Sequence, residues 1–256
     1  MTPLVLLAGL LSCDADGCGS YLYQPAYCLD NVRRGPARPY QPQPGDIVLA
    51  TDDKIFWKIT HNLAGTGHPH HTGVVFERPD GSMAVLEAGP YDTIRIRILD
   101  AVPHLRCYES KGLVWVRQRR CPLTPEQSRC LTEFAMQQEG KFFALGRLAK
   151  QLTVFRPRGP IRTAWFGGPH GNRRSFYCSE LALEALVAAC ALDPETTRPA
   201  ATYPRDIFFD RSLNPYINRH LKLCDRWYPP ALFTSCPTSI CDEVAPANGS
   251  AEHKSR

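Results

Sequence analysis

The 256-residue sequence lacks most of the features that assign a protein to a class quickly. It has no apolar run near the roughly 20 residues that a membrane-spanning helix needs. None of its 11 cysteines has the C-x-x-C spacing of a zinc ribbon or a thioredoxin-like motif. It has no internal repeat, and its net charge of +5 is too small and too scattered to indicate nucleic-acid binding. These absences argue against a membrane-spanning, a zinc-ribbon and a nucleic-acid-binding protein.

What the sequence does have is the composition of a folded domain, with 43% hydrophobic and 21% charged residues. The length predicts one well-buried domain with additions rather than two domains. We expect a signal segment at residues 1–13, a Cys- and Pro-rich extension at 14–43, a main domain at 44–244 and a disordered tail at 245–256.

The N-terminus resembles an export signal. Residues 4–11 form an apolar stretch, and Ser12 precedes Cys13 as at a bacterial lipoprotein cleavage site, although the first three residues carry no positive charge. We therefore expect an exported protein of the periplasm or cell envelope. Cys13 is either lipidated, and then a membrane anchor, or part of an ordinary apolar segment.

The number of cysteines also favours export, because a cytosolic enzyme of this size seldom has so many without metal-ligand spacing. Cys190 lies in a predicted interior helix and is expected to be a free, buried thiol. We expect disulfides among several of the others, with no defined pairing: Cys18, Cys28, Cys107, Cys121, Cys130, Cys224, Cys236 and Cys241.

The apolar pattern predicts strands first and the main buried helix later. Turn residues 78–81 join two β-rich segments, and Thr124 begins a helix with an N-cap and a capping-box Gln127. Residues 156–174 indicate a long loop rich in Gly, Pro and Arg. The predicted strands are 46–50, 72–77, 82–88, 93–99 and 113–117, and the predicted helices are 55–63, 124–139 and 178–192. Together they predict one α+β domain.

Cys178 is the first candidate for chemistry, because it opens the predicted buried helix directly after the long loop. The dipole of a helix favours a thiolate at its N-terminus, and the free N–H groups there can hold a developing oxyanion. The structural alternative is a small buried hydrophobic side chain.

Two further side chains fit a cysteine nucleophile. His71 stands at the mouth of a predicted strand, where an imidazole can be held rigidly toward a neighbouring helix. The hairpin turn would bring Glu87 near the start of the His71 strand, so that its carboxylate could orient the imidazole. Glu87 could otherwise be a surface residue at a strand end.

The histidines at 68, 70 and 71 also admit a metal site. No carboxylate or cysteine lies at a useful spacing, and Pro69 interrupts the cluster. We therefore expect neither a metal nor a cofactor, and we interpret His68 and His70 as part of a polar loop tip.

Four short motifs occur in a fixed order: residues 44–48 (PGDIV), 71–75 (HTGVV), 86–88 (LEA) and 177–181 (YCSEL). This ordered set resembles the permuted papain-like amidases of the YaeF/YiiX group, which are related to the NlpC-type cell-wall peptidases. The resemblance covers about residues 44–210, including 202–206 (TYPRD), and only the order of the motifs is specific.

The resemblance implies a papain-like, NlpC-type fold in permuted order, with an antiparallel sheet or small barrel packed against helices. It implies Cys178 as nucleophile, His71 as base and Glu87 as the third polar residue of a cysteine amidase. Asp46 falls in a segment that borders the family's active site; it is either a substrate-binding candidate or, by default, a structural residue. The other candidates for substrate binding are Tyr177, Trp165, Arg173 and Arg174, which lie beside Cys178 or in the loop before it.

Three functions stay open. The first is a hydrolase of cell-wall peptide amides or small N-acyl substrates, acting through a thioacyl-enzyme. The second is a lipid acyltransferase or thioesterase, since lecithin:retinol-acyltransferase-like proteins use a similar His and Cys arrangement. The third is a non-catalytic envelope binding protein, whose Cys178 would have ordinary reactivity and ignore His71.

Overall fold

The computed structural model describes residues 19–23, 35–51, 67–89, 93–150, 160–212 and 221–236. Several predictions fall outside these residues: the signal segment with Cys13, most of the Cys- and Pro-rich extension, the helix at 55–63 and the tail at 245–256.

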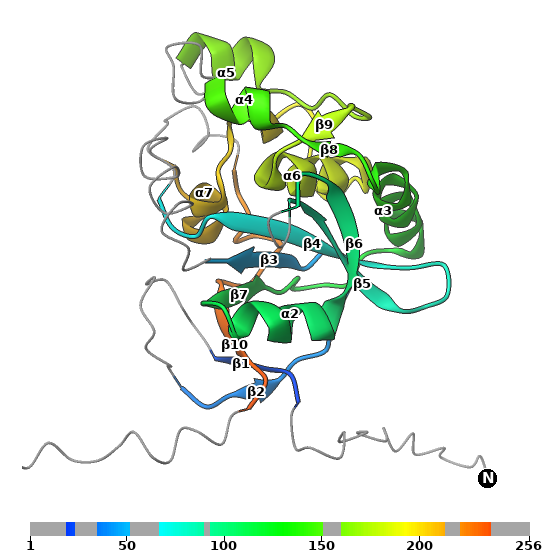
Figure 1. Cartoon of the computed structure of the whole chain (residues 1–256), viewed down its shortest axis with the longest axis vertical. Coiled ribbons are helices and arrows are strands. Elements are labelled where there is room, and N and C mark those ends of the chain that lie inside the picture. The colour runs from blue at the N-terminus through cyan, green and yellow to red at the C-terminus, as the bar shows by residue number, and fades with distance from the viewer. Residues whose placement is uncertain are drawn as a thin grey trace, which may run out of the picture.

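Eight antiparallel strands form one sheet in the order β2-β1-β10-β7-β3-β4-β5-β6 (Figure 1). The strands are β1 (Tyr21–Tyr23), β2 (Arg38–Pro39), β3 (Ile47–Ala50), β4 (His71–Glu77), β5 (Met83–Ala88), β6 (Ile96–Asp100), β7 (Val114–Arg117) and β10 (Ala231–Thr234). Within the described strands, the edges β2 and β6 do not pair with each other. Of the two expected arrangements, the sheet is therefore found and the closed barrel is wrong.

Four of the five predicted strands are confirmed to within a residue or so at β3, β4, β5 and β7. The predicted strand 93–99 starts later, because β6 begins at Ile96, which is fully buried, whereas Ile94 is 53% exposed. The turn between β4 and β5 also forms as expected, with Gly81 at φ +84°.

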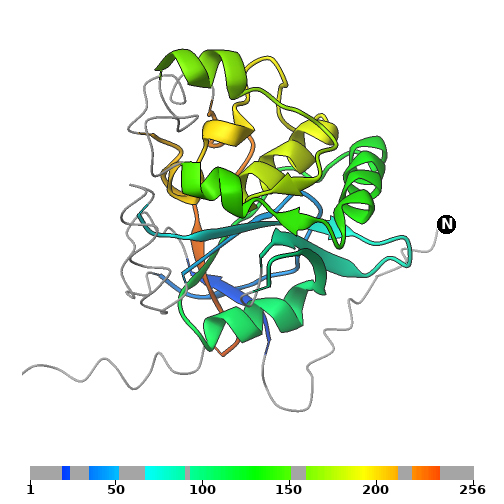
Figure 2. The same ribbon diagram turned by 45° about the horizontal axis from the view of Figure 1, so that its top comes forward.

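Helices cover both faces of the sheet (Figures 1 and 2). On one face, α6 (Cys178–Ala188) packs on β4 and β5, and α3 (Pro125–Gln138) packs on β4 and β6. On the other face, α2 (Ala101–Glu109) packs through Leu105 and Tyr108. The predicted capping box of α3 is confirmed, since Thr124 accepts from the Gln127 backbone N–H and the Gln127 side chain accepts from that of Thr124. The sheet thus separates α6 from α2.

Three predictions about helices were wrong. The helix that begins at Cys178 ends at Ala188 rather than 192, because the chain reverses at Cys190, whose φ is +51°. Cys190 is therefore exposed, not buried. The predicted loop at 156–174 contains a helix, α5 (Pro160–Phe166). The sequence interpretation also missed α2 altogether, because Pro103 suggests a break although proline is tolerated in a first helical turn.

The remaining described elements are short. They are α4 (Leu145–Lys150), α7 (Pro204–Phe209), the 3-10 turn η2 (Pro199–Ala201) and the parallel pair β8 (Phe142–Phe143) and β9 (Ser175–Phe176). No described helix is long and apolar enough to cross a membrane.

The predicted extension contributes to the main sheet, since β1 pairs with β10 and β2 pairs with β1. The seven described cysteines are all free thiols, and only Cys178 among them is buried. Cys18, Cys28 and Cys241 lie outside the described residues, so disulfides that involve them stay a prediction.

Candidate active site

The start of β4 places His71 beside Glu87. Side chains alternate along a strand, so His71 and Gly73 face the same side of the sheet. Glu87 on β5 stands opposite Gly73, and its side chain reaches diagonally to His71. The Nε2 atom of His71 lies 3.0 Å from Oε2 of Glu87, which is fully buried. This confirms the register on which the sequence interpretation paired the two residues.

Gly73 makes that diagonal contact possible. A Cβ atom at this position would stand 2.6 Å from Cγ of Glu87 and 2.7 Å from its Oε1. Both distances are shorter than any normal contact, so a side chain here would displace the carboxylate. Gly73 belongs to the motif at residues 71–75, but only the register of β4 and β5 reveals its role.

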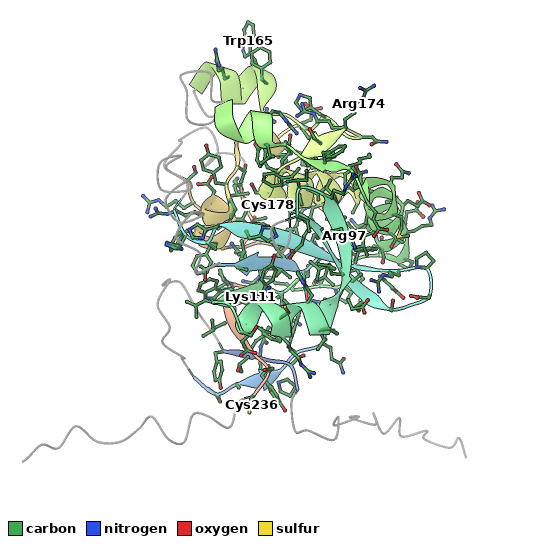
Figure 3. The ribbon with its side chains drawn as sticks, viewed as in Figure 1. Arg97, Lys111, Trp165, Arg174, Cys178 and Cys236 are labelled. Atoms are coloured by element: carbon green, nitrogen blue, oxygen red, sulfur yellow. The ribbon has the colours of Figure 1, made fainter. Side chains whose placement is uncertain are left out.

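Cys178 approaches from the first turn of α6, in the middle of the molecule (Figure 3). Its side chain is 6% exposed, and Sγ lies 3.7 Å from the backbone oxygen of His70. The thiol also lies within hydrogen-bonding reach of the His71 side chain. Since Nε2 of His71 faces Glu87, Nδ1 is the nitrogen left for the thiol. In the structure, His71 therefore lies between the other two predicted residues, with Glu87 on one side of its ring and Cys178 on the other.

The electrostatics of these three side chains favour an ionised carboxylate and a protonated imidazole. Burial by itself raises the pKa of Glu87, but the charges and hydrogen bonds of His104 and His71 hold it well below its usual range. Burial by itself lowers the pKa of His71. The charge of Glu87 and the hydrogen bonds to Cys178 and Glu87 outweigh that effect and raise the pKa of His71 to about 10. An imidazolium beside a thiol is the arrangement that stabilises a thiolate.

Two site residues escaped the sequence interpretation, and both come from α2. His104 Nε2 lies 2.9 Å from Oε2 of Glu87, and the Tyr108 hydroxyl donates to the same oxygen at 3.0 Å. Both side chains are buried. Their spacing of four residues places them on one helix face, which is the signal that a correct prediction of α2 would have revealed.

Tyr177 and Arg173 lie in the segment before Cys178, and both side chains form contacts within the fold. Tyr177 precedes α6, and its hydroxyl donates to the backbone oxygen of Ala200. Arg173 forms an ion pair with Glu180 at 2.8 Å, and Arg147 contacts the same buried carboxylate at 2.6 Å. These contacts fasten the segment before Cys178 to the first turn of α6.

Trp165 and Arg174 are exposed and lie away from the thiol. Trp165 is 78% exposed and stands at the end of the molecule formed by α5, well separated from Cys178 (Figure 3). Arg174 lines two shallow hollows of about 610 and 520 Å³, both of which Phe142 also lines. The structure does not bring these two side chains to Cys178.

Asp46 also lies away from Cys178. Its backbone oxygen accepts from Val75, whereas the start of β4 at His71 pairs with Ala50. Four residues of strand, roughly 13 Å, therefore separate Asp46 from the His71 end. Its buried carboxylate accepts from Arg119 N at 2.8 Å and from the Tyr40 hydroxyl at 2.9 Å. Asp46 thus fixes the loop before β3.

A metal centre finds no support in the described part of the chain, where no group of three or more His, Cys, Asp or Glu side chains could hold an ion. The His68 and His70 rings contact each other at a tilt of 51°, with centroids 4.0 Å apart, while His71 contacts Glu87.

Comparisons with known proteins add little to this geometry. No protein-family model and no curated protein matches the chain. A search of solved structures finds similarity to the metalloprotein YiiX from Escherichia coli O157:H7, with 18% identity and a TM-score of 0.42. The match covers 79% of this chain and 93% of that one. Because this likeness is low, the account of the site depends on the contacts of this chain alone.

Proposed function

We propose that this chain is a cysteine hydrolase that cleaves an amide or related acyl bond through a thioacyl-enzyme. Cys178 is the nucleophile, His71 is the acid and base, and Glu87 orients His71. The observation that carries the proposal is the buried line of contacts from Glu87 through His71 to a thiol at the start of a helix. Each part of this line has a defined use in acyl transfer.

In the first half of the reaction, the Cys178 thiolate attacks the carbonyl carbon of the substrate. A C–S bond forms, and the carbonyl oxygen becomes an oxyanion near the first N–H groups of α6. The oxyanion then collapses, the C–N bond breaks, and the His71 imidazolium gives its proton to the departing amine. The products are a free amine and a thioester on Cys178.

In the second half, a water molecule attacks the thioester carbon while neutral His71 accepts a proton from it. The C–S bond breaks, the carboxylic acid leaves, and Cys178 and His71 return to the thiolate–imidazolium pair. Glu87 stays ionised throughout and keeps the His71 ring in the orientation that both halves need.

The ordered motifs support the same proposal from the sequence. Their resemblance to the permuted papain-like amidases of the YaeF/YiiX group places a histidine strand before a cysteine helix, as β4 precedes α6 here. A permuted papain-like fold and a cell-wall peptide or N-acyl substrate are therefore part of the proposal. Chain order is no objection, because a triad is defined by its geometry.

A lipid acyltransferase or thioesterase is the second candidate, and several exposed apolar side chains favour it. Four large side chains on the β8, α4 and α5 segments face solvent: Phe142 at 51%, Leu145 at 47%, Trp165 at 78% and Phe166 at 61%. Exposed aromatic and aliphatic side chains near basic residues suit a lipid substrate. The two candidates share the acylation step and differ in the acceptor that removes the acyl group.

Trapping the acyl-enzyme tests the proposal. The protein is mixed with a p-nitrophenyl ester and quenched in acid, and the intact mass is measured for wild type and for Cys178→Ser. We expect the mass of one acyl group on Cys178 and none on the serine variant. Release by water supports the hydrolase, whereas release only by an added amine or lysolipid supports the acyltransferase. A chain that never acylates at Cys178 contradicts both and fits the non-catalytic binding protein.

A further inference from the structure

The two oxygens of the Glu87 carboxylate have unequal numbers of contacts. Three side chains meet on Oε2: His71 through Nε2 at 3.0 Å, His104 through Nε2 at 2.9 Å and Tyr108 through its hydroxyl at 3.0 Å. Within the described residues, the other oxygen, Oε1, has no hydrogen-bond partner. The two side chains from α2 therefore contact the same oxygen atom that contacts His71.

An acceptor that is shared among several donors holds each of them less strongly, because they draw on the same negative charge. This matters for a residue that must both donate and accept a proton. An imidazolium held too firmly by a carboxylate cannot give its proton to a leaving amine. An imidazole held too weakly cannot keep a thiolate ionised.

We propose that His104 and Tyr108 are positioning residues that compete with His71 for Oε2 of Glu87 and so weaken the hold of Glu87 on the His71 imidazolium. This inference rests on the proposed function for its purpose, but the competition itself is a property of the four side chains. By strand alternation, His71 and Glu87 point to the same face of the sheet as Val75 and Val85, which pack with Tyr108, so α2 reaches the carboxylate from the face that carries both side chains.

Among the described residues, a charged group also stands beside Glu87 on the neighbouring strand: Arg97 is opposite Glu87 in the pairing of β5 with β6. Its side chain is exposed, and the structure records no ion pair between Arg97 and Glu87 in the described residues. The imidazole of His71 thus faces Glu87 and Cys178, while Glu87 faces His71, His104 and Tyr108.

The chain provides a matched pair of variants for the test. Tyr108→Phe removes a buried hydroxyl that donates to Glu87 at 3.0 Å. Tyr40→Phe removes a buried hydroxyl that donates to Asp46 at 2.9 Å, away from the His71 end of β4. The two substitutions delete the same atom from the same kind of contact, so their difference reports the Glu87 cluster alone. His104→Gln keeps a neutral donor near the Nε2 position, and His104→Leu removes it.

The experiment is an NMR titration of the histidine side chains in each variant, with His71 assigned by the signal that His71→Ala loses. Tyr108→Phe should raise the titration midpoint of His71 by about 0.5 to 1 pH unit, since each donor on a carboxylate is worth roughly that much. Tyr40→Phe should leave the midpoint unchanged, and His104→Gln should shift it less than His104→Leu.

No shift in Tyr108→Phe, a downward shift, or an equal shift in Tyr40→Phe would overturn the competition. If His104→Leu does not fold, the two tyrosine variants decide the matter. The titration does not depend on a reactive Cys178. If Cys178 is never acylated but Tyr108→Phe raises the His71 midpoint, the hydrolase is refuted and the competition for Glu87 stands. If Cys178 is acylated but the midpoint does not rise, the hydrolase stands and the competition is refuted.

Discussion

Two buried carboxylates in the same sheet have opposite electrostatic character. Glu87 is surrounded by two imidazoles and a hydroxyl, and its pKa is held well below its usual range although burial raises it. Asp46 is buried as completely, but its direct hydrogen-bond partners are neutral, among them two backbone N–H groups and the Tyr40 hydroxyl, and the charge of Arg119 acts on it without a side-chain hydrogen bond. Burial therefore prevails over these hydrogen bonds and raises the pKa of Asp46 to about 7.

The difference shows what separates a charged site from a structural one. Hydrogen bonds from neutral donors fix the position of Asp46 without holding its pKa in the ordinary carboxyl range. Groups that can carry a positive charge keep Glu87 ionised. The negative charge of Glu87 favours a protonated His71, which in the proposed mechanism stabilises the Cys178 thiolate. Changes to the Glu87 cluster should therefore affect the thiol, and changes to the Asp46 cluster should affect stability.

The largest expected effect is on stability and concerns Asp46→Asn. Asp46 has a folded pKa of about 7 against 3.8 for the free side chain, so the wild type loses stability as pH rises from about 4 to 7. The full loss is about 4 kcal/mol at roughly 1.4 kcal/mol for each pKa unit. Asp46→Asn should remove this decline, as measured by urea unfolding at a series of pH values.

The Glu87 cluster contributes with the opposite sign. Because the folded pKa of Glu87 is depressed, its stabilisation is present above the ordinary carboxyl pKa and is lost as the solution becomes more acidic. Parallel stability curves for wild type and Asp46→Asn between pH 4 and 7 would show that the pKa of Asp46 is not raised. The contrast between the two carboxylates would then be wrong.

The second effect concerns the glycine that lets Glu87 reach His71. Gly73→Ala should destabilise the protein by about 1–3 kcal/mol, because its Cβ meets Cγ and Oε1 of Glu87. It should also slow alkylation of Cys178, since the carboxylate moves away from His71. Gly146→Ala is the control, because a Cβ there meets no atom within 4 Å and lies in a helix. Equal unfolding temperatures of the two variants would contradict the role given to Gly73.

A smaller effect separates the two carboxylates directly. Glu87→Gln should slow the alkylation of Cys178 at pH 6 by about tenfold, because an amide keeps a hydrogen bond to His71 but loses the charge. Asp46→Asn should change the same rate by less than about twofold. The rates are measured with iodoacetamide, and the modified cysteine is located by mass spectrometry. Similar slowing in both variants would point to general loosening of the sheet.

Local patterns predicted much of this fold and the central site. Alternating apolar residues located most strands, and the Asp80-Gly81 turn fixed the pairing that places Glu87 near His71. The start of the buried helix identified Cys178 because a helix N-terminus needs little beyond its own sequence to be recognised.

What escaped prediction depends on contacts between distant segments. His104 and Tyr108 meet Glu87 only because α2 folds back over the sheet, and Pro103 hid that helix. The exposure of Cys190 follows from a left-handed residue that no apolar pattern reveals. Asp46 was expected to border the active site, but its distance along β3 from Ala50 places it at the other end of the pairing with β4.

The most direct test of the central claim is the rate of Cys178 alkylation by iodoacetamide at pH 6, in wild type and in His71→Ala. A free thiol with a pKa of roughly 8.5 is about 0.3% thiolate at this pH, so an activated thiol can react up to about 300-fold faster. We predict rapid, selective labelling of Cys178 in wild type and a fall of at least about 100-fold in the variant. Slow labelling of Cys178 in wild type, indifferent to the loss of His71, would contradict the account.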